Sequence, residues 1–135
     1  MKRIAALTLP FAALFANASL ADEKPLFVYV SPNPIGVNDF LKLGKIGTER
    51  VAEALGGVAK TYESSDPTTQ RQNLEAAAKA GAKVVIVIGF EFNDMLPEVA
   101  SAYQNVQFLQ VDSCPFDRLN RTSIARCFVN TNRPF

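Results

Sequence analysis

Apolar residues along this chain follow two alternating spacings. Four short apolar runs predict strands, at residues 25–30, 58–62, 84–88 and 106–111. Three intervening segments with apolar residues at steps of three and four predict helices, at residues 40–55, 67–80 and 95–103. Strands that alternate with helices are joined by right-handed crossovers and lie parallel. We therefore predict an α/β fold in which a parallel sheet carries helices on both faces.

The first predicted helix has the clearest apolar stripe. Its predicted buried face consists of Phe40, Leu43, Gly47, Val51 and Leu55. Asn38 or Asp39 can cap the start of this helix, and the glycine pair at 56–57 ends it. Gly44 and Gly47 inside the helix lower its intrinsic stability. We expect a close approach to the sheet or to a ligand to compensate for these glycines.

Polar residues and prolines mark the starts of the other two helices. Asp66 suits the N-cap of the second helix, with Pro67 at its first position. Asn93 or Asp94 suits the N-cap of the third helix. The strand at residues 84–88 has no polar face, which is typical of a central strand covered by helices on both sides.

The turns after the strands form the predicted binding edge. In an open parallel sheet, ligands bind outside the carboxyl ends of the strands. Gly89 lets the chain turn sharply or lie close to a ligand, and Phe90 and Phe92 could supply flat apolar surface there. Asp112 could accept hydrogen bonds from a donor-rich ligand. The alternative is that both rings pack beneath the edge and that Asp112 only caps a turn.

The composition argues against several kinds of chemistry. The 135 residues suit one domain, contain no histidine and carry a formal net charge of +1. There is therefore no ordinary Ser-His-Asp or Cys-His arrangement, and no basic field for nucleic acid. We expect no enzyme activity, no cofactor and no nucleic-acid partner. Four acids near the predicted edge could hold a hard cation, although acids at helix starts are more often caps: Asp39, Glu91, Asp94 and Asp112.

The first 21 residues have the pattern of a secretory signal peptide. A basic start precedes an apolar run at residues 4–16, which is too short to span a bilayer, and small residues follow at cleavage spacing. Cleavage after Ala21 would leave one α/β lobe at residues 22–135, and cleavage after Ala18 is the alternative. We expect the mature protein in an exported, oxidising compartment.

An oxidising compartment would allow the two cysteines of the chain to form a disulfide. Cys114 and Cys127 could close a short loop as a disulfide, which would stabilise the fold by about 3 kcal/mol on the chain-entropy estimate. The alternative is two free, partly buried thiols, because the geometry of a disulfide cannot be read from sequence.

Three segments of the chain carry a family resemblance. They read YVSPNPIGVNDFLKLGKIGTERVAEALG, KTYESSDPTTQRQNLEAAAKAGAKVVIVIGFEFNDMLPEVASAY and VQFLQVDSC. These segments closely resemble the basic membrane protein family, the periplasmic substrate-binding proteins of ABC importers, whose characterised members bind purine nucleosides. The resemblance covers about residues 27–127. Its most specific pieces are the GFEFND…PEVA block and the strand that ends in VD.

The resemblance implies one lobe of a type I periplasmic-binding-protein-like fold, in which two α/β lobes close on a ligand. In that family the base stacks between aromatic side chains, and Phe40 takes the first aromatic position here. Val37 stands where the family has an acid that contacts the sugar, and Asp112 matches the acid that hydrogen-bonds the base. The predicted ligand-binding residues are Asn38, Phe40, Gly89, Phe90 and Asp112.

Members of the family are longer and have a second lobe. The resemblance ends just after Cys127, where this chain reads FVNTNRPF and the family reads something like F-R-E-Y-E. We therefore expect a frameshifted or truncated copy that keeps the N-terminal lobe and binds its ligand poorly. The resemblance also implies a periplasmic location, a nucleoside-like ligand and an ABC permease of the inner membrane as partner. The alternatives are an exported interaction or sensory module without a transport role, and an exported α/β enzyme that uses acids near Asp112 with a metal.

Overall fold

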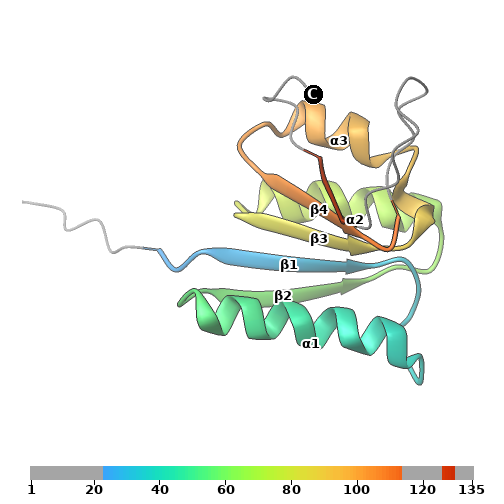
Figure 1. Cartoon of the computed structure of the whole chain (residues 1–135). Coiled ribbons are helices and arrows are strands. Elements are labelled where there is room, and N and C mark those ends of the chain that lie inside the picture. Colours follow the sequence, from blue (N-terminus) through green and yellow to red (C-terminus); the bar gives the residue numbers. More distant parts are fainter. Residues whose placement is uncertain (1–22, 114–125, 130–135) are drawn as a thin grey trace, which may run out of the picture.

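A five-stranded sheet forms the middle layer of the structure, a computed structural model that describes residues 23–113 and 126–129 (Figure 1). The strand order is β2-β1-β3-β4-β5. The strands are β1 (Leu26–Ser31), β2 (Val58–Glu63), β3 (Val84–Ile88), β4 (Gln107–Val111) and β5 (Arg126–Val129). The helices are α1 (Asp39–Ala54), α2 (Pro67–Lys79), the short 3-10 helix η1 (Phe90–Phe92) and α3 (Leu96–Ala102).

The first four strands run parallel, as predicted. α1 packs on one face of the sheet, and α2 and α3 pack on the other, which confirms the predicted α/β fold (Figure 1). The sequence pattern did not indicate β5, which pairs antiparallel with β4. A strand of four residues offers few alternating positions, so its hydrophobic pattern carries little signal.

Two predictions fall outside the described residues. One is the signal peptide at residues 1–21, and the other is the disulfide between Cys114 and Cys127, because Cys114 is not described. Both stay predictions. Within residues 23–113 and 126–129, no helix combines the length and the apolar character that crossing a bilayer requires.

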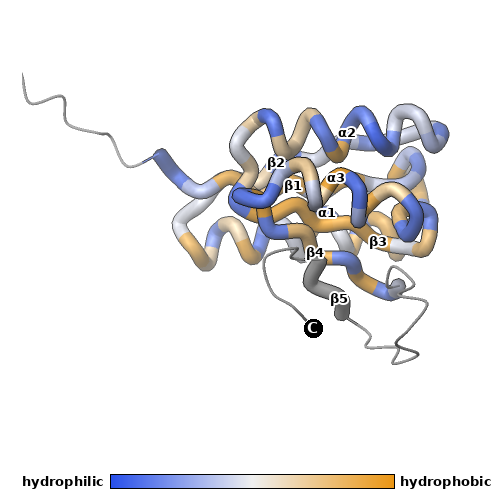
Figure 2. The backbone as a smooth tube through the Cα atoms, turned by 90° about the horizontal axis from the view of Figure 1, so that it is seen from above, coloured by the Kyte–Doolittle hydropathy of each residue, from blue (hydrophilic) through white to orange (hydrophobic). Residues whose placement is uncertain are grey.

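Two apolar clusters hold the helices to the sheet. Successive side chains of a strand point to opposite faces, so neighbouring residues of β1 enter different clusters. Val28 and Val30 pack with Leu74 and Val99 under α2 and α3. Tyr29 packs on the α1 side of the sheet. Figure 2 shows the apolar colour concentrated in β1 and β3, between helices that carry many hydrophilic turns.

The buried face of α1 differs from the prediction. The residues of α1 that face the sheet are Leu41, Gly44, Thr48 and Ala52. The residues of the predicted stripe are exposed: Phe40, Leu43, Gly47, Val51 and Leu55. Leu43 is 65% exposed, whereas Leu41 is only 4% exposed. The predicted buried face of this helix is therefore wrong.

Gly44 explains how α1 packs. A Cβ at Gly44 would run into Ile88 and lie 2.7 Å from Cζ of Tyr29, so only a glycine lets α1 approach β1 and β3 this closely. The hydroxyl of Thr48 donates to the carbonyl of Gly44 at 2.9 Å, which satisfies a polar group inside the contact. The expected approach to the sheet is confirmed at Gly44. Large apolar residues dominate the hydrophobic periodicity of a helix, so the pattern indicates the wrong face when a helix packs through small residues, as α1 does.

Paired substitutions in α1 test this packing. Leu41→Ala removes a buried side chain and should lower the free energy of unfolding by about 3 kcal/mol. Leu43→Ala trims a side chain that is mostly in solvent and should lower it by less than about 0.5 kcal/mol. Urea unfolding followed by circular dichroism measures both losses. A larger loss for Leu43→Ala would show that the predicted stripe is the buried one.

Candidate functional site

The carboxyl ends of four parallel strands meet at one edge of the sheet. Ile88 at the end of β3 pairs with Val111 at the end of β4. Ser31 at the end of β1 pairs with Glu63 at the end of β2, and β1 and β3 are themselves in register. In Figure 1 the arrowheads of these strands point to this edge. The loops that leave it are called the rim: residues 32–38, 64–66, 89–95 and 112–113.

Three predicted site residues are open to solvent at the rim or directly beside it. Phe40 at the start of α1 is 48% exposed, and Phe90 in η1 is 73% exposed. Asp112 after β4 is also exposed. Phe92, in contrast, is fully buried in the apolar cluster under α2 and α3, so the suggestion that its ring faces a ligand is wrong. The η1 turn thus directs one ring outward and buries the other.

Asn38 caps α1, which confirms one of the two caps predicted for this helix. Its Oδ1 accepts the backbone N–H of Phe40 at 3.0 Å and that of Leu41 at 3.2 Å. These bonds satisfy two of the donors that the first turn of a helix leaves without partners. The cap also fixes the backbone that carries the Phe40 ring. Any ligand contact of Asn38 would therefore use its amide nitrogen.

Two long-range hydrogen bonds hold the loop that leads to α1. The backbone N–H of Ile35 donates to the Glu63 carboxylate at 2.9 Å. The buried amide nitrogen of Gln70 in α2 donates to the carbonyl of Pro32 at 2.9 Å. The loop before Phe40 is thus anchored from β2 and from α2, which are both outside its own segment.

Gly89 occupies a conformation that side chains disfavour. Its φ is +97°, and a Cβ there would collide with the carboxylate of Glu91. Its N–H donates to the carbonyl of Val111 at 3.1 Å, so the β3–β4 pairing continues one step into the rim. The sharp turn predicted at Gly89 is therefore confirmed, while its contact with a ligand stays a prediction.

Asp112 also has a left-handed backbone, with φ of +66°. A non-glycine residue in this region pays about 1–2 kcal/mol, although aspartate tolerates it better than most residues. Such strain persists only where the surrounding structure imposes it, and it is common at functional sites. The acid that the resemblance singled out is thus both exposed and held in an unusual conformation.

A buried amide network lies behind these residues, and the sequence analysis did not find it. Gln110 in β4 donates from Nε2 to the carbonyl of Gly89 at 2.6 Å and to Oδ1 of Asn93 at 2.7 Å. The hydroxyl of Ser113 donates to the same Asn93 oxygen at 3.0 Å. Neither Asn93 nor Asp94 caps α3, so both predicted alternatives are wrong: its N-cap is Met95, which makes no side-chain bond. A glutamine inside an apolar strand was the signal that could have revealed the network.

Acidic side chains surround the rim, and one of them has a shifted pKa. Hydrogen bonds from the backbone N–H of Thr69 and the hydroxyl of Ser65 lower the pKa of Asp66. Asp66 is the N-cap of α2, as predicted, and it also forms a capping box with Thr69. Between the sheet and α1, burial raises the pKa of the Tyr29 hydroxyl. In the described part of the chain, no group of three or more acids or cysteines could hold a metal ion. The suggested hard-cation site therefore has no support there.

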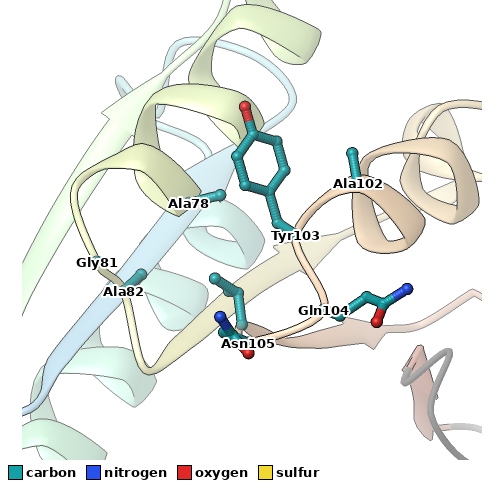
Figure 3. A pocket seen from close by; sticks show the side chains of 8 residues that line it. Ala78, Gly81, Ala82, Ala102, Tyr103, Gln104 and Asn105 are labelled. Carbon is teal, nitrogen blue, oxygen red and sulfur yellow. The ribbon is translucent and has the colours of Figure 1, made fainter.

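A separate cavity of about 360 Å³ lies at the opposite edge of the sheet (Figure 3). It is lined by the segments that precede β3 and β4 and by the ends of α2 and α3: Ala78, Gly81, Ala82, Ala102, Tyr103, Gln104, Asn105 and Val106. The Tyr103 ring stands between Ala78 and Ala102 in Figure 3. Its polar side chains are partly or fully exposed, so the cavity shows none of the buried polar anchors of a ligand site.

The comparisons with known proteins show what the fold resembles. No protein-family model matches the chain, and no curated protein matches it. An ABC-transporter solute-binding protein from Aeropyrum pernix K1 superposes with a TM-score of 0.57 at 22% identity, over 67% of this chain and 25% of that protein. A fragment assigned as a lipoprotein from Peptoclostridium difficile 630 gives a TM-score of 0.58 at 20% identity, over 70% of this chain and 77% of the fragment.

These similarities establish the fold of the chain. The predicted α/β fold is shared with the matched part of both structures, and its assignment as one lobe of a periplasmic-binding-protein-like fold stays a prediction. The chain spans about a quarter of the solute-binding protein that it matches. At identities of 22% and 20%, the ligand does not follow from either structure. The structure thus brings the predicted residues to one edge, and their contact with a ligand stays a prediction.

The cap of α2 predicts a pH dependence of stability. The pKa of Asp66 is lowered in the folded state, so its stabilising effect is present above the unfolded pKa of about 3.9 and is lost as pH falls through the lower folded value. Asp66→Asn keeps the cap oxygen without the charge. We expect the melting temperature of the wild type to fall more steeply than that of Asp66→Asn below about pH 4. Calorimetric scans between pH 7 and 3 measure the two slopes, and parallel slopes would contradict the assignment.

Proposed function

We propose that this chain is the N-terminal lobe of a periplasmic solute-binding protein of an ABC importer, and that its rim receives nucleoside-like solutes. One observation carries the proposal: the exposed Phe40 and Phe90 rings and the exposed, strained Asp112 are all held at the carboxyl edge of one parallel sheet. This edge is where ligands bind in open α/β folds. The resemblance to the basic membrane protein family and the fold of the solute-binding protein support the same conclusion.

The chemistry of the rim suits a flat, donor-rich solute. An exposed aromatic ring offers stacking to any base, and a carboxylate accepts N–H groups from it. Acids outnumber bases at the rim, where Asp66, Asp94 and Asp112 are all exposed. This favours a neutral or cationic donor over a phosphorylated ligand. A nucleoside without phosphate meets these conditions.

One lobe alone should bind weakly. Stacking on one ring contributes about 1–3 kcal/mol per base. A hydrogen bond to a charged group adds about 1.5–3 kcal/mol. Association costs at least about 4 kcal/mol in lost translational and rotational freedom. At most about 2 kcal/mol remains, so we expect a dissociation constant of tens of millimolar or weaker for this lobe.

Nuclear magnetic resonance titration tests the proposal at this affinity. Adenosine, guanosine and inosine are added to the ¹⁵N-labelled chain up to about 10 mM or their solubility limit, which occupies a detectable fraction of so weak a site. We expect concentration-dependent shifts of the Phe40, Phe90 and Asp112 amides. Phe40→Ala and Asp112→Asn should each reduce these shifts at least several-fold, because the first removes stacking surface and the second removes the anionic acceptor.

Two matched controls make the result specific to the rim. Leu43→Ala trims another exposed apolar residue of α1 and should leave the shifts unchanged. Inosine monophosphate should bind less well than inosine, because its phosphate meets an acidic rim. If none of the three nucleosides shifts the rim amides of the folded wild type, the proposed ligand class is wrong.

A second candidate function is an exported interaction or sensory module without a transport role. The exposed apolar side chains of α1 favour it, because a surface of this kind often marks a protein contact: Phe40, Leu43, Ile46, Val51 and Leu55. A ligand-free lobe that docks through α1 would show no nucleoside shifts at the rim. The titration therefore separates the two candidates.

The remaining parts of the proposal rest on the sequence. We infer an exported, periplasmic protein with an ABC permease as partner and without enzyme activity, since the chain contains no histidine and resembles binding proteins.

A further inference from the structure

Gln110 is a polar residue at a buried position of β4, where an apolar side chain is expected. It is 0% exposed, it lies opposite Val87 of β3, and its side chain is on the same face of β4 as Phe108. Its Oε1 is buried and has no hydrogen-bond partner. An unsatisfied buried amide oxygen is costly, so a valine or leucine would serve the core better. The position therefore calls for an explanation beyond the packing of the core.

The contacts of the Gln110 side chain allow only one placement of its amide oxygen and nitrogen. The carbonyl of Gly89, 2.6 Å away, can only accept, so it must face the NH₂ group. The second N–H of that group then donates to Oδ1 of Asn93 at 2.7 Å, which in turn fixes the orientation of Asn93. The same oxygen receives the hydroxyl of Ser113 at 3.0 Å. Both donors of Gln110 are thus used, and both bonds go to rim segments.

The two rim segments joined in this way carry two candidate ligand residues. Gly89 and Asn93 enclose the η1 turn that presents Phe90, and the N–H of Asn93 donates to the carbonyl of Phe90 at 3.0 Å. Ser113 follows Asp112, whose φ of +66° needs support from its surroundings. A single buried network therefore connects the exposed ring and the strained carboxylate.

We infer that Gln110 is a positioning residue: through Gly89, Asn93 and Ser113 it holds Phe90 and Asp112 in a fixed mutual geometry before any ligand arrives. The part of this inference that concerns ligand binding rests on the proposed function. The part that concerns the order of the two rim segments does not. A preformed site avoids the cost of ordering loops on binding, which matters most when one lobe supplies few contacts.

Gln110→Met tests the inference with an apolar side chain of similar length. It leaves the Gly89 carbonyl and the Asn93 oxygen without their buried donor. We expect ¹⁵N order parameters at residues 89–93 and 112–113 of the ligand-free protein to fall from rigid values near about 0.85 to below about 0.6. Ser113→Ala breaks the network on one side only. It should loosen residues 112–113 and leave residues 89–93 unchanged, and it keeps the test open if Gln110→Met does not fold.

Val85→Ala is the control for a purely structural effect. Val85 is fully buried in the same apolar cluster but is on β3, away from the rim network. This variant should lower the melting temperature while the order parameters of both rim segments stay at wild-type values. If the order parameters of both rim segments also stay at wild-type values in Gln110→Met and in Ser113→Ala, Gln110 has only a packing role and the inference is overturned.

Inosine then separates failure of the inference from failure of the proposed function. If the wild type binds, Gln110→Met should reduce the inosine-induced shifts of Phe90 and Asp112 at least several-fold, while Val85→Ala retains them. Retained shifts in Gln110→Met would overturn the inference for the binding site. If the folded wild type shows no shifts but Gln110→Met still loosens both segments, the proposed ligand is wrong and the positioning role stands.

Discussion

The parallel register of β1, β3 and β4 is the constraint on which the rim depends. Because Ile88 pairs with Val111, the residues that follow them leave the sheet at the same level, and the N–H of Gly89 extends the ladder by one further bond. The rim is therefore a continuation of the sheet rather than a set of independent loops. A shift of one residue in β4 would move Gln110 to the α1 face and remove the network that joins its two segments.

The rotation of α1 about its axis is the second determinant of the site. Gly44 fixes this rotation, because it is where the helix comes closest to Tyr29 and Ile88. A rotation that buried Leu43 and Val51 would turn Phe40 toward the sheet, since these residues share one side of the helix. The same rotation of α1 therefore exposes both the apolar stripe and the Phe40 ring. Packing through small residues is what leaves an aromatic ring at the edge of the sheet.

The parts of the fold that were predictable are those in which local pattern and local chemistry agree. The four parallel strands, the Asn38 cap and the Asp66 cap all follow from features within a few residues of each position. The burial of Phe92 and the hydrogen bonds of Gln110 depend on contacts made across the sheet, about which a single strand carries little information. Asn93 resembled a helix cap because capping and network formation use the same side chain.

The candidate site combines a rigid backbone with very little enclosing surface. Its loops are held by bonds from elements outside them, such as Glu63 to the loop before α1 and Gln110 to the turn after β3. Its rings, however, face solvent on at least one side. Order of this kind lowers the cost of binding but cannot supply the contact area that a small solute needs for tight binding. For the proposed solute-binding function, this balance means that the rim would form one wall of a cleft and that tight binding would need a further surface opposite it.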